Sequence, residues 1–175
     1  MRDENRFTFN ISLSVLNHLG RNLYRNFVTV LGEGISNSWD ADAKNVWIYL
    51  NKDKGELLIK DDGDGMTAED FRNKFLKVGY SKRGVDGTVI KSNLGRPYIG
   101  RKGIGKLALL SCAKKVSVLT KTAEGDYVGG AIDNSGLDTA ISEDSPNYDL
   151  EVVDLHKFKP YLDQHEHGTM ILFEG

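Results

Sequence analysis

Residues 45–66, NVWIYLNKDKGELLIKDDGDGM, decide the fold. Residues 45–50 and 56–60 are rich in β-branched, aromatic and leucine side chains, which is typical of strands, and Asn51–Gly55 between them carries the turn residues of a hairpin. The second strand runs directly into DDGDGM, where acidic residues alternate with glycines. The sequence therefore predicts a hairpin that places carboxylates at the end of a strand.

The segments on either side predict a mixture of helices and strands. Residues 22–42 repeat apolar side chains every three or four positions, as on one helix face, although Gly32 and Gly34 argue against a helix by about 1 kcal/mol each. Thr67 opens a helix with an acidic first turn. Further helices are expected at 12–19 and 104–113, a long glycine-rich loop at 79–103, and strands near 115–122, 126–132, 149–155 and 168–174. This pattern predicts an α+β protein, a layered helix-on-sheet sandwich.

Composition narrows the class of protein. The chain has 175 residues, 19 glycines, one cysteine and a net charge of −2. That length fits one domain, and the near-neutral charge does not indicate nucleic-acid binding. The polar start resembles no signal peptide, and no apolar run reaches the ~18 residues of a membrane helix. With a single thiol, Cys112, that we expect to be a core residue, the sequence predicts a cytoplasmic protein without membrane attachment.

The acidic loop predicts a base-binding site. A carboxylate fixed at a strand end, such as Asp61, can accept a hydrogen bond from an exocyclic amine such as the adenine N6 group. Gly63 and Gly65 would let the backbone pack against a flat base. An ordinary Asp-Gly turn fits the same residues. A calcium loop does not, because the glycine and the late glutamate of that pattern are absent.

A second group of polar residues falls on the predicted helix. Glu33, Asn37 and Asp40 are separated by four and three residues, so they share a helix face. The Asn37 amide oxygen suits Mg²⁺, which prefers oxygen ligands, and the Glu33 carboxylate can deprotonate a water molecule. A solvated helix face is the alternative.

Two further motifs complete the set. Residues 100–108, GRKGIGKLA, place glycines before a helix, where backbone N–H groups can hold phosphates, and the long loop contributes Lys82. The residues do not form a P-loop. Gly168-Thr169 opens the last strand, and the Thr169 hydroxyl can join the network of Asp61, although an ordinary β-branched strand residue fits equally.

In this order the motifs resemble those of the GHKL superfamily, which comprises gyrase B, the heat-shock ninety chaperones, histidine kinases and MutL. E-x-x-x-N-x-x-D-A, D-x-G-x-G-M, G-x-x-G-x-G and G-T-x-I-x-F span residues 33–173. Glu33 places the chain nearer the chaperone, MutL and MORC branches, because the kinases usually carry asparagine there. The resemblance implies a Bergerat-type two-layer sandwich, with helices on one face of a mixed, mostly antiparallel sheet.

The resemblance also implies roles for residues. Glu33 is expected to be catalytic, activating the attacking water, and Asn37 to bind Mg²⁺. Asp61 is expected to bind the adenine amine, with Thr169 beside it. The remaining nucleotide-binding positions are expected at Asp40, Ala41, Gly63, Gly65, Met66, Lys82, Gly100, Lys102, Gly103, Ile104, Gly105 and Lys106.

The implied activity is Mg²⁺-dependent ATP hydrolysis that drives conformational change or dimerisation in a larger machine. Residues 1–175 are expected to form one ATP-binding domain with a lid at about 79–103. They are expected to be the N-terminal part of a longer protein, and weakly active alone. A homodimer would form through the N-terminal region or through downstream domains. Phosphotransfer to a partner histidine, and a nucleotide-gated binding module with little turnover, remain alternatives.

Overall fold

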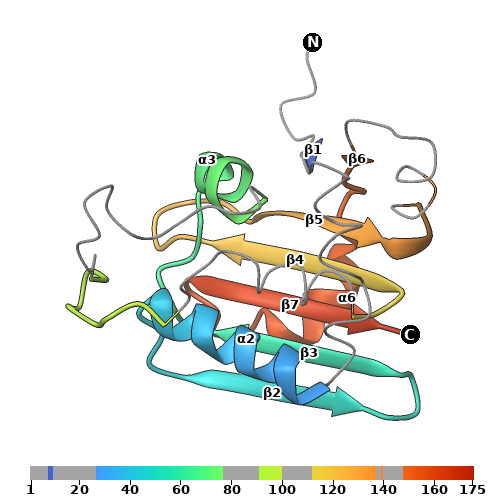
Figure 1. Cartoon of the computed structure of the whole chain (residues 1–175), viewed down its shortest axis with the longest axis horizontal. Coiled ribbons are helices and arrows are strands. Elements are labelled where there is room, and N and C mark those ends of the chain that lie inside the picture. Colours follow the sequence, from blue (N-terminus) through green and yellow to red (C-terminus); the bar gives the residue numbers. More distant parts are fainter. Residues whose placement is uncertain (1–7, 10–26, 77–90, 100–111, 137–138, 140–147) are drawn as a thin grey trace.

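The computed structural model describes residues 8–9, 27–76, 91–99, 112–136, 139 and 148–175. These residues form an antiparallel sheet with helical segments on its two faces (Figure 1). The strands lie in the order β2-β3-β7-β4-β5, and all four described pairings are antiparallel. Their bounds are β2 Val46–Asn51, β3 Glu56–Asp61, β4 Lys115–Lys121, β5 Val128–Asp133 and β7 Gly168–Glu174.

The predicted hairpin is confirmed as β2 and β3, with Val46 opposite Asp61 and Asn51 opposite Glu56. The last strand in sequence, β7, lies in the middle of the sheet between β3 and β4. Strand β3 pairs with β7 in the antiparallel direction, so Asp61 at the end of β3 lies beside Gly168 and Thr169 at the start of β7. The sheet order thus joins motifs that are separated by more than a hundred residues.

Successive side chains of a strand point to opposite faces of the sheet. Apolar side chains form a cluster on each of the two faces. One face holds a core cluster that includes Val30 of helix α2 (Phe27–Asp40) and Leu57 and Ile59 of β3. The opposite face holds a second cluster under helix α6 (Leu155–Phe158), with Leu58 and Phe158. The 3-10 turn η3 (Lys159–Tyr161) extends α6.

Helix α2 is continuous through both of its glycines, so the helix predicted from apolar spacing is confirmed although Gly32 and Gly34 each disfavour it. A Cβ added at Gly34 would lie 2.7 Å from Ile59 Cδ1, whereas one added at Gly32 would meet nothing within 4 Å. Gly34 therefore permits a close approach of α2 to β3. Packing of the apolar face against the sheet outweighs the low helix propensity of glycine.

Thr67 caps the next helix as predicted, its Oγ1 accepting the N–H of Asp70. Helix α3 (Ala68–Asp70) continues into a π-helical turn, η2 (Phe71–Phe75), whose Phe71 and Phe75 are buried. The expected strand at 149–155 is wrong over most of its length. Strand β6 is only Tyr148–Asp149, which pairs with β1 (Thr8–Phe9), and α6 begins at Leu155.

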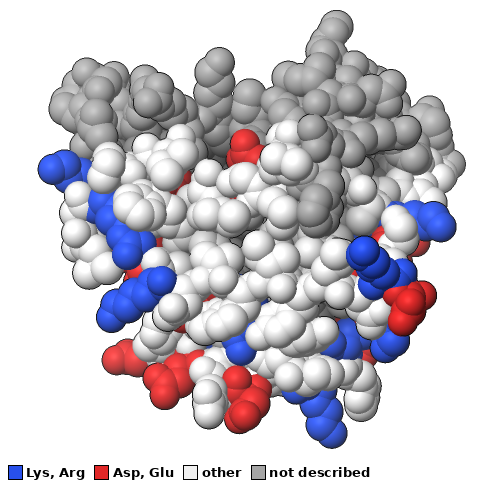
Figure 2. Space-filling view, turned by 90° about the horizontal axis from the view of Figure 1, so that it is seen from below, with Lys and Arg blue, Asp and Glu red and all other residues white. Residues whose placement is uncertain are grey.

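Strand β2 lies at the lower edge of the sheet in Figure 1. Within the described residues, its one strand partner is β3. Trp47, Ile48, Tyr49 and Leu50 are all exposed. Seen from this side, the middle of the described surface is mostly uncharged, and charged side chains gather toward its margin (Figure 2). The hairpin is therefore apolar on its outer edge as well as toward the core.

Candidate functional site

Helix α2 brings Glu33, Asn37 and Asp40 onto one side, as their spacing predicts. Glu33 and Asn37 are half-buried and Asp40 is buried. Partial burial, and secondarily the nearby charge of Asp40, raise the pKa of Glu33 above its ordinary value. A carboxylate with a raised pKa is a stronger proton acceptor than an exposed one.

The Asn37 side chain contains an unpaired polar atom. Its Nδ2 is buried and has no hydrogen-bond partner among the residues that the structure describes. A buried donor without an acceptor costs roughly 1–3 kcal/mol. The amide is therefore suited to a ligand that supplies an acceptor, and its oxygen is of the kind that Mg²⁺ prefers.

The Asp61 carboxylate is the centre of a buried network. Its Oδ1 accepts the N–H groups of Gly63 at 2.9 Å and Thr169 at 3.0 Å. Its Oδ2 accepts the Ser38 hydroxyl at 2.8 Å. Burial raises the pKa of Asp61, while these three donors act in the opposite direction. Donors from α2, from the loop after β3 and from the start of β7 thus hold one carboxylate in a single orientation.

A second hydroxyl extends the network on the sheet. Thr120 of β4 is fully buried, its Oγ1 lies 2.9 Å from the Thr169 Oγ1, and it also accepts the N–H of Met66 at 3.1 Å. Thr120 and Ser38 were not expected from the sequence. Nothing in the sequence around Ser38 or Thr120 sets it apart from other serines and threonines. Only the contact of Ser38 with Asp61, and that of Thr120 with Thr169, shows that they belong to the network.

Glycines allow the backbones around Asp61 to approach closely. A Cβ at Gly63 would lie 2.7 Å from the Ala41 carbonyl oxygen, and one at Gly65, where φ is +68°, would lie 1.9 Å from that of Lys121. The Asp64 N–H donates to the Ala41 carbonyl at 2.7 Å. Gly63 therefore packs against Ala41, directly after α2, and Gly65 packs against Lys121 at the end of β4.

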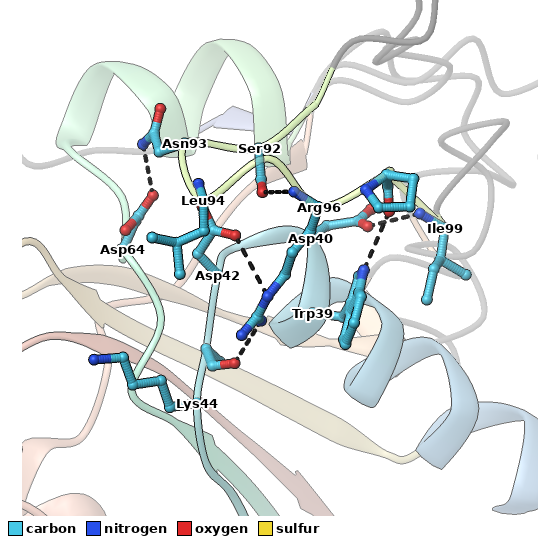
Figure 3. A network of polar contacts seen from close by, with 12 residues as sticks. Trp39, Asp40, Asp42, Lys44, Asp64, Ser92, Asn93, Leu94, Arg96 and Ile99 are labelled. Carbon is cyan, nitrogen blue, oxygen red and sulfur yellow. Dashed lines mark hydrogen bonds and ion pairs between the residues drawn. The ribbon is translucent and has the colours of Figure 1, made fainter.

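Asp40 has a further contact that the sequence did not predict. Its Oδ1 accepts the N–H of Ile99 at 2.8 Å, so it binds the segment 91–99. This segment belongs to the predicted lid. It lies against the end of α2 and the residues that follow it (Figure 3).

We call the contacts of segment 91–99 with the end of α2 the clasp. The Trp39 Nε1 donates to the Pro97 carbonyl at 3.1 Å, and the Arg96 guanidinium lies 4.6 Å from the Trp39 ring centre. Arg96 also donates to the Ala43 carbonyl at 2.7 Å, and Asp42 Oδ2 accepts the Leu94 N–H at 2.9 Å. Figure 3 shows these side chains meeting at the helix end.

Several of the expected site positions lie outside the described residues. The predicted helix at 12–19 and most of the predicted helix at 104–113 also lie outside them. These positions are Lys82, Gly100, Lys102, Gly103, Ile104, Gly105 and Lys106. The described part of the site therefore consists of the base-binding and helix residues. Cys112, half-buried against the core, has its pKa raised to about 11 by burial, which agrees with a structural thiol.

The described residues contain neither a membrane-spanning helix nor a cluster of metal-ligating side chains. Within 8–9, 27–76, 91–99, 112–136, 139 and 148–175, no helix is long and apolar enough to cross a membrane. The same residues contain no group of three or more histidine, cysteine or acidic side chains placed to hold a metal ion.

Comparison with known proteins identifies relatives of two kinds. The chain is 37% identical over 142 residues to the "Putative type II restriction enzyme HgiDII" of Herpetosiphon aurantiacus, covering 81% of this chain and 22% of that protein. It is 32% identical over 89 residues to the chaperone HtpG of Oceanobacillus iheyensis, covering 51% and 14%. The HtpG of Buchnera aphidicola is 29% identical over 176 residues, covering 86% and 26%. The chain thus spans about a quarter or less of each relative.

A family model also matches most of the chain. Residues 24–169 match the model of histidine kinase-, DNA gyrase B- and HSP90-like ATPases. The match runs from before α2 to Thr169, so it includes the Glu33–Ala41 helix, the Asp61 loop and the start of β7. The described α+β architecture, with its antiparallel five-stranded sheet, agrees with this family. The chain belongs to the GHKL superfamily, the histidine kinase-, DNA gyrase B- and HSP90-like ATPases.

Proposed function

We propose that this domain binds ATP with its adenine against Asp61 and hydrolyses it with Glu33 as the general base. The observation that carries the proposal is the Asp61 carboxylate. An ionised carboxylate has about four acceptor sites, and Gly63, Thr169 and Ser38 supply three donors. One acceptor site is left for the exocyclic amine of adenine.

The neighbouring residues support the same ligand. Gly63 approaches Ala41 closely and Gly65 approaches Lys121 closely, and we propose that these residues and Met66 border the flat base. The Thr169 hydroxyl, already paired with Thr120, can extend the network to the base. Gly100, Lys102, Gly103, Ile104, Gly105 and Lys106, with Lys82 from the lid, are proposed to hold the phosphates.

Asn37 fits the phosphate end of the ligand. Among the described residues its buried Nδ2 has no acceptor, and phosphate oxygens would supply one. Its amide oxygen would hold Mg²⁺, which neutralises phosphate charge. Glu33, one turn before Asn37, would orient a water molecule and take its proton, and the raised pKa of Glu33 favours that transfer.

We propose further that residues 1–175 act as the ATPase module of a larger protein, in which binding and hydrolysis drive a conformational change or dimerisation. The relatives support this, because all of them are several times longer than the part they share with this chain. The name of the Herpetosiphon relative favours a second candidate, an ATPase module of a DNA-processing protein. Stimulation of ATP hydrolysis by DNA in the full-length protein would favour that candidate, and its absence would favour a chaperone-like machine.

The test separates catalysis from binding. Glu33→Ala should lower turnover by about 10²–10⁴-fold and leave ATP affinity nearly unchanged, because a general base acts only when water attacks. Asn37→Ala should weaken Mg²⁺-dependent ATP binding as well. In the parent, turnover should fall as pH falls through the Glu33 pKa, which lies above 4.5, because the protonated acid cannot accept a proton. The measurements are phosphate release and calorimetric ATP binding.

Three outcomes would change the proposal. Equal turnover in Glu33→Ala and the parent would remove the general-base role and leave a nucleotide-gated binding module. Transfer of phosphate to protein without release would favour a kinase-like phosphotransfer domain. No binding of ATP at millimolar concentration would overturn the proposed function.

A further inference from the structure

Two histidines contact the Asp61 loop from the side of strand β7. They lie in Gln164-His165-Glu166-His167, directly before Gly168 and Thr169. His165 is buried and His167 is half-buried. Neither was expected from the sequence to belong to the site.

Both imidazoles donate to backbone carbonyls of the loop. The His167 Nδ1 lies 2.6 Å from the Gly63 carbonyl oxygen, and the His165 Nε2 lies 3.1 Å from that of Asp61. A carbonyl oxygen only accepts hydrogen bonds, so each of these ring nitrogens carries the proton. This fixes the ring nitrogen of each histidine that carries a proton toward the loop.

Tyr127 packs against the second nitrogen of His165. Its hydroxyl lies 2.9 Å from the His165 Nδ1 and also donates to the His165 carbonyl oxygen at 3.1 Å. The two rings are stacked, 5.9 Å between centres. Burial lowers the pKa of His165, which favours the neutral ring.

The bonded carbonyls control the orientation of the Asp61 carboxylate. The peptide between residues 62 and 63 provides the Gly63 N–H that binds Asp61 Oδ1. The Asp61 and Gly63 carbonyls belong to the peptides on either side of it. Holding both of those peptides fixes the rotation of the middle one, and with it the donor that aligns the carboxylate.

The backbone is built to bring the histidines this close. Gly168 has a φ of +119°, and a Cβ there would lie 2.1 Å from the Asp61 carbonyl oxygen. Lys60, directly before Asp61, donates from its Nζ to the Tyr161 carbonyl at 2.7 Å. The chain thus contacts β3 on both sides of the histidines, before them at Tyr161 and after them at Gly168.

We propose that His165 and His167 are positioning residues of the nucleotide site, which hold the Asp61–Gly63 backbone in the geometry that selects a purine with an amine at C6. This rests on the proposed function, and it assigns the discrimination between ATP and GTP to a group that need not touch the base. Guanine carries a carbonyl where adenine carries the amine. A fixed carboxylate rejects guanine, whereas a loosened one discriminates less.

The test uses His167, which is less buried than His165 and safer to replace. His167→Leu removes the donor, whereas His167→Asn keeps an N–H at the position of Nδ1. His156→Leu, at an exposed histidine of α6, is the matched control. Affinities for ATP and GTP are measured by calorimetry, and amide exchange of the ligand-free chain is measured at Gly63 and Asp64.

His167→Leu should weaken ATP binding by roughly tenfold, the usual loss for one hydrogen bond, and lower the ratio of ATP to GTP affinity. It should also speed exchange of the Gly63 amide, and His167→Asn should restore all three quantities. Parental values in His167→Leu, or equal losses in His167→Leu and His167→Asn, would overturn the inference. A parent that binds neither nucleotide would overturn the proposed function, while exchange at Gly63 would still decide whether His167 holds the loop.

Discussion

Two neighbouring residues of α2 enter networks of opposite character. Ser38 is buried and donates to the Asp61 carboxylate, within a set of contacts enclosed by the sheet. Trp39 is 40% exposed and donates to the Pro97 carbonyl, within the clasp at the surface. Buried polar bonds are costly to break because the partners cannot turn to water, whereas exposed ones contribute little. The Asp61 network should therefore be a fixed frame and the clasp a releasable one.

The comparison bears on the predicted lid. Segment 91–99 falls within residues 79–103, and the structure describes it as clasped to the end of α2. Most of these contacts are part-buried, so the clasp should open at a smaller cost in free energy than the buried Asp61 network. That residues 79–103 become protected on nucleotide binding stays a prediction, and hydrogen exchange with and without a non-hydrolysable ATP analogue would check it.

The largest effect is expected from Asp61→Asn, which breaks the buried network. The NH₂ group of the amide faces either the Ser38 hydroxyl, in the place of Oδ2, or the N–H groups of both Gly63 and Thr169, in the place of Oδ1. One or two buried hydrogen bonds are therefore lost. ATP affinity should fall by roughly 1–3 kcal/mol, the cost of losing a charged buried hydrogen bond. Calorimetry is the measurement, with the exposed Asp64→Asn as control. Unchanged affinity would show that Asp61 is not the base contact.

Gly34→Ala should disturb the same network through packing. The added Cβ would lie 2.7 Å from the buried Ile59 Cδ1, and overpacking of this kind costs about 1–3 kcal/mol, partly offset by a gain in helix propensity of about 1 kcal/mol. Gly32→Ala is the matched control, because it meets no neighbour and should stabilise by about 0.5–1 kcal/mol. Denaturant unfolding measures both.

If Gly34→Ala were stabilised as much as Gly32→Ala, the close approach of α2 to β3 would not matter for folding. If instead it lost stability and ATP affinity together, Gly34 would be linked to the Asp61 network through Ser38, whose hydroxyl lies 3.1 Å from the Gly34 carbonyl.

The smallest effect is expected from Arg96→Ala, which opens the clasp. The variant loses the bond to the Ala43 carbonyl and the contact with the Trp39 ring. The free energy of unfolding should fall by about 1 kcal/mol, since the bond to Ala43 is part-buried and the buried Asp42 carboxylate lies 3.8 Å from the Arg96 Nε. Exchange of the Leu94 and Ile99 amides should nevertheless accelerate.

Lys91→Ala, an exposed replacement in the same segment, should leave the exchange of these amides unchanged. The Gly63 amide should exchange at the parental rate in both variants. A large loss of global stability in Arg96→Ala would contradict the division into a fixed frame and a releasable clasp.

Local patterns determined much of this protein. The hairpin of residues 45–61, the α2 helix, the Thr67 cap and the closing strand all follow from alternation, helical spacing and turn residues. The same patterns failed at 149–155, where Val152 is exposed and Val153 is buried as in a strand, yet the Asp154 carboxylate caps α6 instead. The family too could be recognised from four short motifs, because each needs only a few fixed residue types.

The tertiary structure alone decided which side chains share the Asp61 network. Ser38 lies 23 residues from Asp61 along the chain, and His167 lies 104 residues from Gly63. Serine and histidine have many roles, so neither residue type indicates its partner. From the sequence, Gly34 only disfavours a helix, because the close contact that favours glycine there is with Ile59 of β3. Spacing along the sequence predicts what lies on one helix or strand, whereas contacts between elements depend on how the sheet orders its strands.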